Sequence, residues 1–174
     1  MKVLNIGSMN LDYVYSVDHI IAPGETQATY GMNVFLGGKG INQSIALAKA
    51  GVYIYHGGMI GEDGQVFLDA CREHGVHDEF IRTIDEKTGH TIIQVDKNAQ
   101  NCILLFGGAN QSLTEEYIDE QIKNVLYKND YQAIALIDIL HQNVYLRLNH
   151  ATKEIKENNY IDYQKVIDLV TQNQ

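Results

Sequence analysis

The chain has 174 residues and a formal net charge of −9, from 13 Lys and Arg against 22 Asp and Glu. Apolar residues make up 45% and charged residues 20%, which is ordinary for a globular chain and excludes an intrinsically disordered one. The acidic balance argues against nucleic acid as the main partner, because binding to phosphates needs clustered Lys and Arg. The length fits one domain with a sizeable core.

The two cysteines, Cys71 and Cys102, are too few for a disulfide framework and lack the paired spacing of metal ligands. No apolar run approaches the roughly 20 residues that cross a bilayer. The first seven residues reach a glycine before the apolar core of a signal peptide could form. We therefore expect a cytoplasmic protein without a membrane partner.

Short apolar, aromatic or β-branched runs predict strands in the first half of the chain, and apolar stripes at helical spacing predict helices. The predicted elements are, in order, strands at 3–7, 13–18 and 29–36, a helix at 42–50, a strand at 52–60 and a helix at 64–74. Both helices end at a glycine, Gly51 and Gly75, which is typical of a helix C-terminus. The following residues, from His74 to Glu79, are expected to form a surface turn rather than a metal site.

The second half continues the pattern. The predicted elements are strands at 91–95 and 102–106, a helix that starts at 113–116, a strand at 133–137 and helices at 143–156 and 162–170. Thr114 is the N-cap candidate of the first of these helices. Cys71 lies on the apolar face of its predicted helix and is expected in the core, whereas Cys102 begins a strand and is expected to be partly exposed.

The alternation of strands and helices predicts a layered α/β domain with a largely parallel sheet. Two stretches, 13–36 and 91–106, break the alternation with strand pairs that have no helix between them. We expect these pairs to join into one small antiparallel sheet beside the α/β body. The chain is thus read as a single domain, 1–174, into which these strands are inserted.

A glycine-rich turn at residues 37–40 precedes the helix at 42–50. It is not a P-loop, because Gly40 follows Lys39 where a Ser or Thr should hold Mg²⁺, and Asn33 replaces the first glycine. It is not a dinucleotide-binding turn either, because residues 7–12 hold one glycine and lead into a strand.

The same turn is suited to a small polar ligand. Its glycines allow a ligand to approach the backbone, and the helix that follows leaves N–H groups free. Lys39 and Asn42 add side-chain donors, while Asn10 and Asp12 lie just past the first strand, where open α/β sheets bind ligands. Such groups could hold the hydroxyls of a sugar. Taken singly, Asn10 and Asp12 could instead cap a turn, and the glycines could form only a tight helix entry.

The combination of motifs is more specific than any one of them. The chain contains Gly37-Gly38-Lys39-Gly40-Ile41-Asn42-Gln43-Ser44 with Gly51 and Gly61 downstream, and also Gly7-Ser8-Met9-Asn10-Leu11-Asp12, Pro23-Gly24-Glu25-Thr26, Gly61-Glu62-Asp63-Gly64, Thr88-Gly89 and Gly108-Ala109-Asn110. In order and spacing these resemble the ribokinase branch of the PfkB family of carbohydrate kinases. The resemblance runs from about residue 3 to residue 139.

This resemblance implies a Rossmann-like, ribokinase-like α/β body that carries a small β-sheet lid, with a sugar such as ribose bound between them. The substrate-binding residues carried over by position are Asn10, Asp12, Gly38, Lys39, Gly40, Asn42 and, on a later strand, Asp138. It also implies ATP and Mg²⁺ as cofactors and a homodimer formed through the lids. The aromatic residues of the lid, such as Tyr30 and Phe35, are expected to pack.

The catalytic signature of the family, Gly-Ala-Gly-Asp, is absent from these 174 residues. The resemblance places the catalytic base, the anion hole and the main ATP-binding segments in that later part of the family chain. We therefore expect a truncated domain with no catalytic or metal-binding residue, inactive alone, and with an altered tail at 153–174. A non-catalytic sugar-binding domain or a lid-mediated dimerisation module remain the alternatives.

Overall fold

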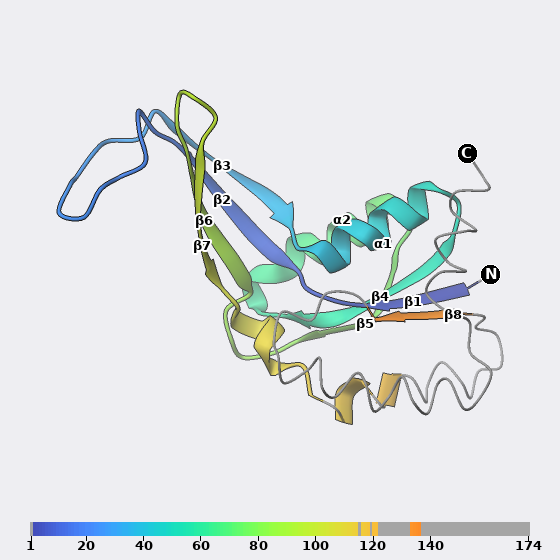
Figure 1. Ribbon diagram of the computed structural model, residues 1–174. Helices are drawn as coiled ribbons and strands as arrows, with labels where there is room; N and C mark the ends of the chain where they lie inside the picture. Colours follow the sequence, from blue (N-terminus) through green and yellow to red (C-terminus); the bar gives the residue numbers. More distant parts are fainter. Residues whose placement is uncertain (1, 115, 119, 122–132, 137–174) are drawn as a thin grey trace.

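The structure is a computed structural model that describes residues 2–114, 116–118, 120–121 and 133–136. Its strands form two four-stranded sheets, and two helices pack on one of them (Figure 1). We call the helix-covered sheet with its helices the body and the other sheet the lid. Within the described part of the chain, no helix is both long enough and apolar enough to cross a membrane.

The body sheet is parallel throughout, with the strand order β5-β4-β1-β8. Its strands are β1 (Lys2–Ile6), β4 (Tyr53–Ile60), β5 (His77–Thr83) and β8 (Ala133–Leu136). The helices α1 (Lys39–Lys49) and α2 (Gln65–His74) lie on one face of this sheet (Figure 1). Val3, Ile54 and Phe67 form part of the core between the sheet and the helices. Burial on both faces is normal for a parallel sheet and explains the apolar runs in β1 and β4.

Helix α2 shows how the local sequence determines an element. Its apolar stripe buries Phe67, Ala70 and Cys71, which confirms the prediction that Cys71 lies in the core. Gly75 ends the helix with φ of 70°, a conformation that favours glycine, and the N–H of Val76 then donates to the Cys71 carbonyl at 2.8 Å. Burial raises the pKa of the Cys71 thiol to about 12, so this side chain is a core group and not a nucleophile.

The lid has the strand order β3-β2-β6-β7. Its strands are β2 (Asn10–Ser16), β3 (Gly31–Gly37), β6 (Gly89–Val95) and β7 (Asn101–Phe106). The two predicted strand pairs do join into one sheet, but the prediction that it is antiparallel is wrong for its centre. The outer pairs β2–β3 and β6–β7 are antiparallel hairpins, whereas β2 and β6 are parallel. The reason is that β2 and β6 both leave the body at the same end, with Asn10 opposite Gly89.

Strand β5 corrects a second prediction, because His77, Asp78 and Glu79 open a strand at the edge of the body sheet rather than a surface turn. Only Phe80 of this strand is buried. An edge strand with polar side chains has no alternating apolar pattern, so its sequence resembles a loop.

The remaining predictions of structure have mixed outcomes. Cys102 is exposed, as expected. Thr114 acts as the N-cap, since its Oγ1 accepts a hydrogen bond from the N–H of Tyr117 at 3.1 Å. The predicted helices at 143–156 and 162–170, the tail at 153–174 and Asp138 lie outside the described residues.

Candidate functional site

Three segments of the chain meet where the lid joins the body. Asn10, the first residue of β2, pairs with Gly37 at the end of β3 and with Gly89 at the start of β6. The glycine turn that follows Gly37 leads directly into α1. The residues predicted to hold a sugar are therefore brought together from positions about 30 apart in the sequence.

The carboxylate of Asp12 is held by two neighbours. Thr91, opposite Asp12 on β6, donates its hydroxyl to Oδ1 of Asp12 at 2.6 Å. Oδ2 lies against Gly37, where an added Cβ would be only 2.0 Å away. The carboxylate thus occupies space that any other residue at position 37 would fill, and its orientation is set before a ligand arrives.

The glycine turn packs tightly on the connection between β1 and β2. Gly38 has φ of 102°, and a Cβ there would lie 2.5 Å from the Ser8 carbonyl oxygen. A Cβ on Gly40 would lie 2.6 Å from Cα of Gly7. Both positions therefore require glycine. The turn places the side chains of Lys39 and Asn42, which are exposed, at the beginning of α1.

Asn110, in the 3-10 helix η2 (Gly108–Ser112), makes hydrogen bonds to three parts of this junction. Its Oδ1 accepts from the N–H of Met9 at 3.0 Å, and its Nδ2 donates to the Met9 carbonyl at 3.0 Å. Nδ2 also lies 2.9 Å from Oδ1 of Asn10 and 3.1 Å from the Gly107 carbonyl. A buried asparagine thereby links the start of β2 to the end of the lid.

Beneath the glycine turn, Asn5, Ser44 and His56 form a hydrogen-bonded chain that is fully buried. Nδ2 of Asn5 donates to the Gly40 carbonyl and to Oγ of Ser44, both at 2.9 Å. Oγ of Ser44 also forms a hydrogen bond with Nδ1 of His56, 2.8 Å away. The chain joins β1, α1 and β4, and it fixes the carbonyl at the start of α1.

His56 is neutral within this network. Burial lowers its pKa to about 3, and the backbone of Gly7 offsets only part of that effect. The ring therefore stays uncharged throughout the physiological range of pH.

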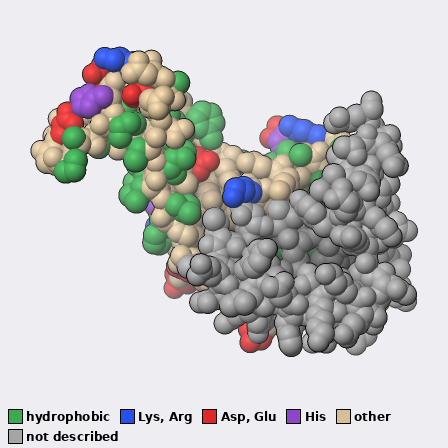
Figure 2. Space-filling view, viewed as in Figure 1, with side chains coloured by type: hydrophobic (Ala, Val, Ile, Leu, Met, Phe, Trp, Pro, Cys, Tyr) green, Lys and Arg blue, Asp and Glu red, His purple; other side chains and the backbone are tan. Residues whose placement is uncertain are grey.

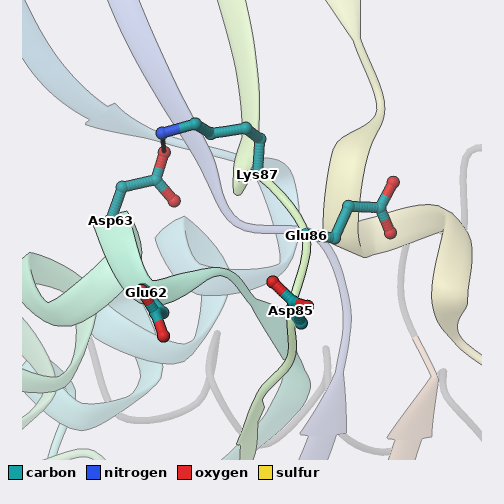
Figure 3. A pocket seen from close by; sticks show the side chains of 5 residues that line it. All are labelled: Glu62, Asp63, Asp85, Glu86 and Lys87. Carbon is teal, nitrogen blue, oxygen red and sulfur yellow. Dashed lines mark ion pairs between the residues drawn. The ribbon is translucent and has the colours of Figure 1, made fainter.

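A shallow surface pocket lies beside the base of the lid (Figure 3). It is lined by Glu62, Asp63, Asp85, Glu86 and Lys87. None of these is a predicted sugar-binding residue. Lys87 Nζ lies 3.5 Å from Oδ2 of Asp63, which is the ion pair drawn in Figure 3. Within the described part of the chain, no group of three or more His, Cys, Asp or Glu side chains could hold a metal ion.

Asp63 has a structural role at this pocket. Its Oδ1 accepts hydrogen bonds from the N–H of Thr88 at 2.9 Å and from its hydroxyl at 2.7 Å. Burial alone would raise the pKa of Asp63, but the bonds from Thr88 and the charge of Lys87 lower it overall. Asp63 thus connects the turn after β4 to the segment that begins β6.

The structure gathers most of the predicted substrate-binding residues at the junction: Asn10, Asp12, Gly38, Lys39, Gly40 and Asn42. Asp138 lies outside the described residues. Sequence reasoning gave no role to Thr91 or to the side chain of Asn110, which contact Asp12 and Asn10. The Gly108-Ala109-Asn110 motif was a signal for Asn110, whereas nothing in the local sequence distinguished Thr91 from other strand residues.

Comparisons with known proteins identify the family of the chain. The model of the pfkB family carbohydrate kinase matches residues 1–172. The chain is 36% identical over 143 residues to the bifunctional ribokinase/ribose-5-phosphate isomerase A of Fructilactobacillus sanfranciscensis, covering 79% of this chain and 26% of that protein. It is 38% identical over 113 residues to the ribokinase of Haemophilus influenzae, covering 63% of this chain and 37% of that protein.

Solved structures agree in fold. The ribokinase of Giardia lamblia matches with a TM-score of 0.78 at 25% identity, over 91% of this chain and 48% of that one. The Arabidopsis thaliana ribokinase complexed with ribose and ATP matches with a TM-score of 0.74 at 27% identity, over 87% of this chain and 50% of that one. The chain spans at most half of the length of these relatives. Its sequence, its fold and the family model together show that it belongs to the pfkB family of carbohydrate kinases, with a ribokinase-like α/β body.

Proposed function

We propose that this chain carries the sugar-binding and lid portion of a ribokinase-like sugar kinase, which transfers phosphate from ATP to a primary hydroxyl of the sugar. The observation that carries this proposal is the convergence of Asn10, Asp12 and the glycine turn at the junction of lid and body. Ribose is the favoured sugar, since the similar Arabidopsis thaliana protein is complexed with ribose.

In this proposal some side chains at the junction accept hydrogen bonds from the sugar and others donate hydrogen bonds to it. Asp12 accepts hydrogen bonds from hydroxyls, because an ionised carboxylate has acceptors only. Asn10, Lys39 and Asn42 supply donors, and the glycines at 38 and 40 let the ring approach the backbone. The proposal also includes Asp138 as a residue that contacts the sugar.

ATP and Mg²⁺ are the cofactors that family membership implies, and the ribokinase from Cryptococcus neoformans that resembles this chain is in complex with ADP. The described residues do not fit either group. The Gly-Ala-Gly-Asp motif is not in the sequence, and the described part holds no cluster of metal ligands. The role assigned to this chain is therefore binding and orientation of the sugar, without a step of phosphate transfer.

The lid supports a homodimer as part of the proposal. Large apolar side chains are exposed on it (Figure 2), and they come from both of its outer strands. They include Met32, Val34 and Phe35 of β3 and Ile103, Leu104, Leu105 and Phe106 of β7. Exposed apolar side chains gathered on one sheet are typical of a protein interface, and an outer strand can also pair with another chain. A cytoplasmic location and the lack of nucleic acid and membrane partners remain predictions.

Calorimetric titration of the purified chain with ribose tests the proposal. We expect binding in the wild type and at least a tenfold weaker Kd in Asp12→Asn, because a charge-assisted hydrogen bond is lost. Asp69→Asn is the matched control, since Asp69 is an exposed carboxylate on α2. No binding of ribose or other sugars by the wild type, or an equal effect of both substitutions, would contradict the proposal.

Two further readouts bear on the alternative functions. An ADP-release assay on the same chain is expected to show no sugar-dependent turnover, because the catalytic motif is absent from it. Binding without turnover suits a sugar-binding module as well as the sugar-binding part of a kinase. A lid-mediated dimerisation module is favoured instead if Asp12→Asn changes only the thermal midpoint.

A further inference from the structure

We propose that Asn110 is a positioning residue that sets the amide of Asn10 with its oxygen inward and its NH₂ group toward the ligand. This inference rests on the proposed function, because it takes Asn10 as a residue that touches the sugar. It assigns a role to a side chain that contacts the substrate only through another residue.

The orientation of the Asn110 amide follows from its two hydrogen bonds to the backbone of one residue, Met9. The N–H of Met9 can only donate, so the atom that faces it must be the oxygen of the Asn110 amide. The Met9 carbonyl can only accept, so the atom that faces it must be the nitrogen. Turning the amide of Asn110 by 180° would oppose donor to donor and acceptor to acceptor at the backbone of Met9.

The orientation of Asn10 then follows from that of Asn110. The Nδ2 of Asn110 donates to the atom of Asn10 that lies 2.9 Å away, so that atom must be the acceptor Oδ1. Asn10 and Asn110 are both largely buried, at 6% and 9% exposure, so a reversed amide would not be rescued by solvent. The NH₂ group of Asn10 is left to serve a ligand as a donor.

The space around this contact is consistent with the assignment. Gly89 lies opposite Asn10 in the sheet, and a Cβ there would be 2.1 Å from Nδ2 of Asn110 and 2.4 Å from Oδ1 of Asn10. A side chain at position 89 would therefore separate the two amides. The bond between them exists because residue 89 is a glycine.

The chemical consequence is a complementary pair on one side of β2. Residues 10 and 12 project to the same face of the strand, since side chains alternate. Asn10 offers a donor and Asp12 offers an acceptor. A hydroxyl, which both donates and accepts, suits this pair better than a group that can do only one. The pair thus selects a polyhydroxylated ligand, and Asn110 maintains the donor half of it.

A double-mutant cycle on ribose binding tests the inference. Asn110→Asp replaces the donor by a carboxylate that repels Oδ1 of Asn10, so the amide of Asn10 should turn. We expect Kd for ribose to rise about tenfold in the wild-type background, the usual effect of one lost hydrogen bond. In an Asn10→Ala background the same substitution should change Kd by less than about twofold. A merely structural role would lower the thermal midpoint and give equal losses in both backgrounds, which would overturn the inference.

Two additions keep the test decisive. Asn110→Ser removes the amide without adding a charge, and it should show the same coupling to Asn10 if Asn110→Asp does not fold. If the wild type binds no sugar, the proposed function fails while the inference is still decided by NMR. The side-chain NH₂ signals of Asn10 should then become protected from exchange in Asn110→Asp, and unchanged signals would contradict the inference.

Discussion

The carboxylate of Asp12 lies where a side chain on Gly37 would be, with Oδ2 only 2.0 Å from the position of an added Cβ. The two residues are on neighbouring strands of the lid, at the end where β2 and β3 meet the body. The backbone of β3 therefore forms one wall of the place that the carboxylate occupies, and the glycine turn continues directly from that wall.

Gly37→Ala is expected to displace the Asp12 carboxylate and to weaken ribose binding at least tenfold. Crowding of this kind also costs roughly 1–3 kcal/mol of stability. Gly31→Ala is the matched control, because it makes the same change at the other end of β3, where a Cβ meets nothing within 4 Å. Calorimetry and thermal melts of both variants give the comparison. Equal affinities in the two variants would show that the position of this carboxylate does not matter for binding.

Thr91→Val is expected to weaken ribose binding severalfold while the fold is kept. Valine has the shape of threonine but lacks the hydroxyl that donates to Oδ1 of Asp12 at 2.6 Å. A hydrogen bond to a charged group is worth about 1.5–3 kcal/mol, and part of that loss should appear in Kd. Thr91→Ser retains the hydroxyl and should recover the affinity. If the serine variant binds as weakly as the valine variant, packing rather than the hydrogen bond is responsible.

The pH dependence of stability should carry the signature of His56. Its pKa is about 3 in the folded protein, below the ordinary value of 6.5 that it regains on unfolding. Between these values the unfolded chain binds the extra proton, so the free energy of unfolding falls as pH drops below 6.5. The slope is up to about 1.4 kcal/mol per pH unit and levels off near pH 3.

Denaturant unfolding of the wild type and of His56→Gln between pH 7 and pH 4 measures this contribution. The variant is less stable at neutral pH, because Ser44 loses its partner, but its stability should fall less steeply with acidification. Titrating carboxylates affect both proteins alike, so the difference between the two curves isolates His56. Parallel curves would contradict the assignment of a buried neutral imidazole.

The sequence was informative where a structural requirement is local. The turn at Gly38 needs a positive φ and close approach to Ser8, so glycine is required there and the turn can be predicted. The helix that ends at Gly75 is predictable for a similar reason. The order of strands and helices in the body follows from apolar runs that are buried on both faces.

The parts that sequence reasoning missed depend on distant pairs. Thr91 and Asp12 are 79 residues apart, and Asn110 and Asn10 are 100 apart, so no local pattern records their hydrogen bonds. The parallel pairing of β2 with β6 is set by where both strands leave the body. Strand β5 was missed because a polar edge strand buries little more than Phe80.

The lid provides the last prediction, because β7 is exposed along its whole length although four of its side chains are large and apolar. In a strand with one buried face, alternate residues should be covered. Here the consecutive residues Ile103 and Leu104, which point to opposite faces, are 54% and 67% exposed. Both faces of this outer strand are thus open to a partner, and a second copy of the lid would present the same apolar surface.

Leu104→Glu should convert a dimer into a monomer in sedimentation equilibrium, because it places a charge in the apolar interface. The thermal midpoint of the monomer should change little, since the side chain contributes little to the core of the folded chain. Val66→Glu on α2 is the control, being an apolar side chain that is 39% exposed outside the lid. If Leu104→Glu leaves the mass unchanged, or if Val66→Glu dissociates the dimer as effectively, the lid is not the interface between copies of this chain.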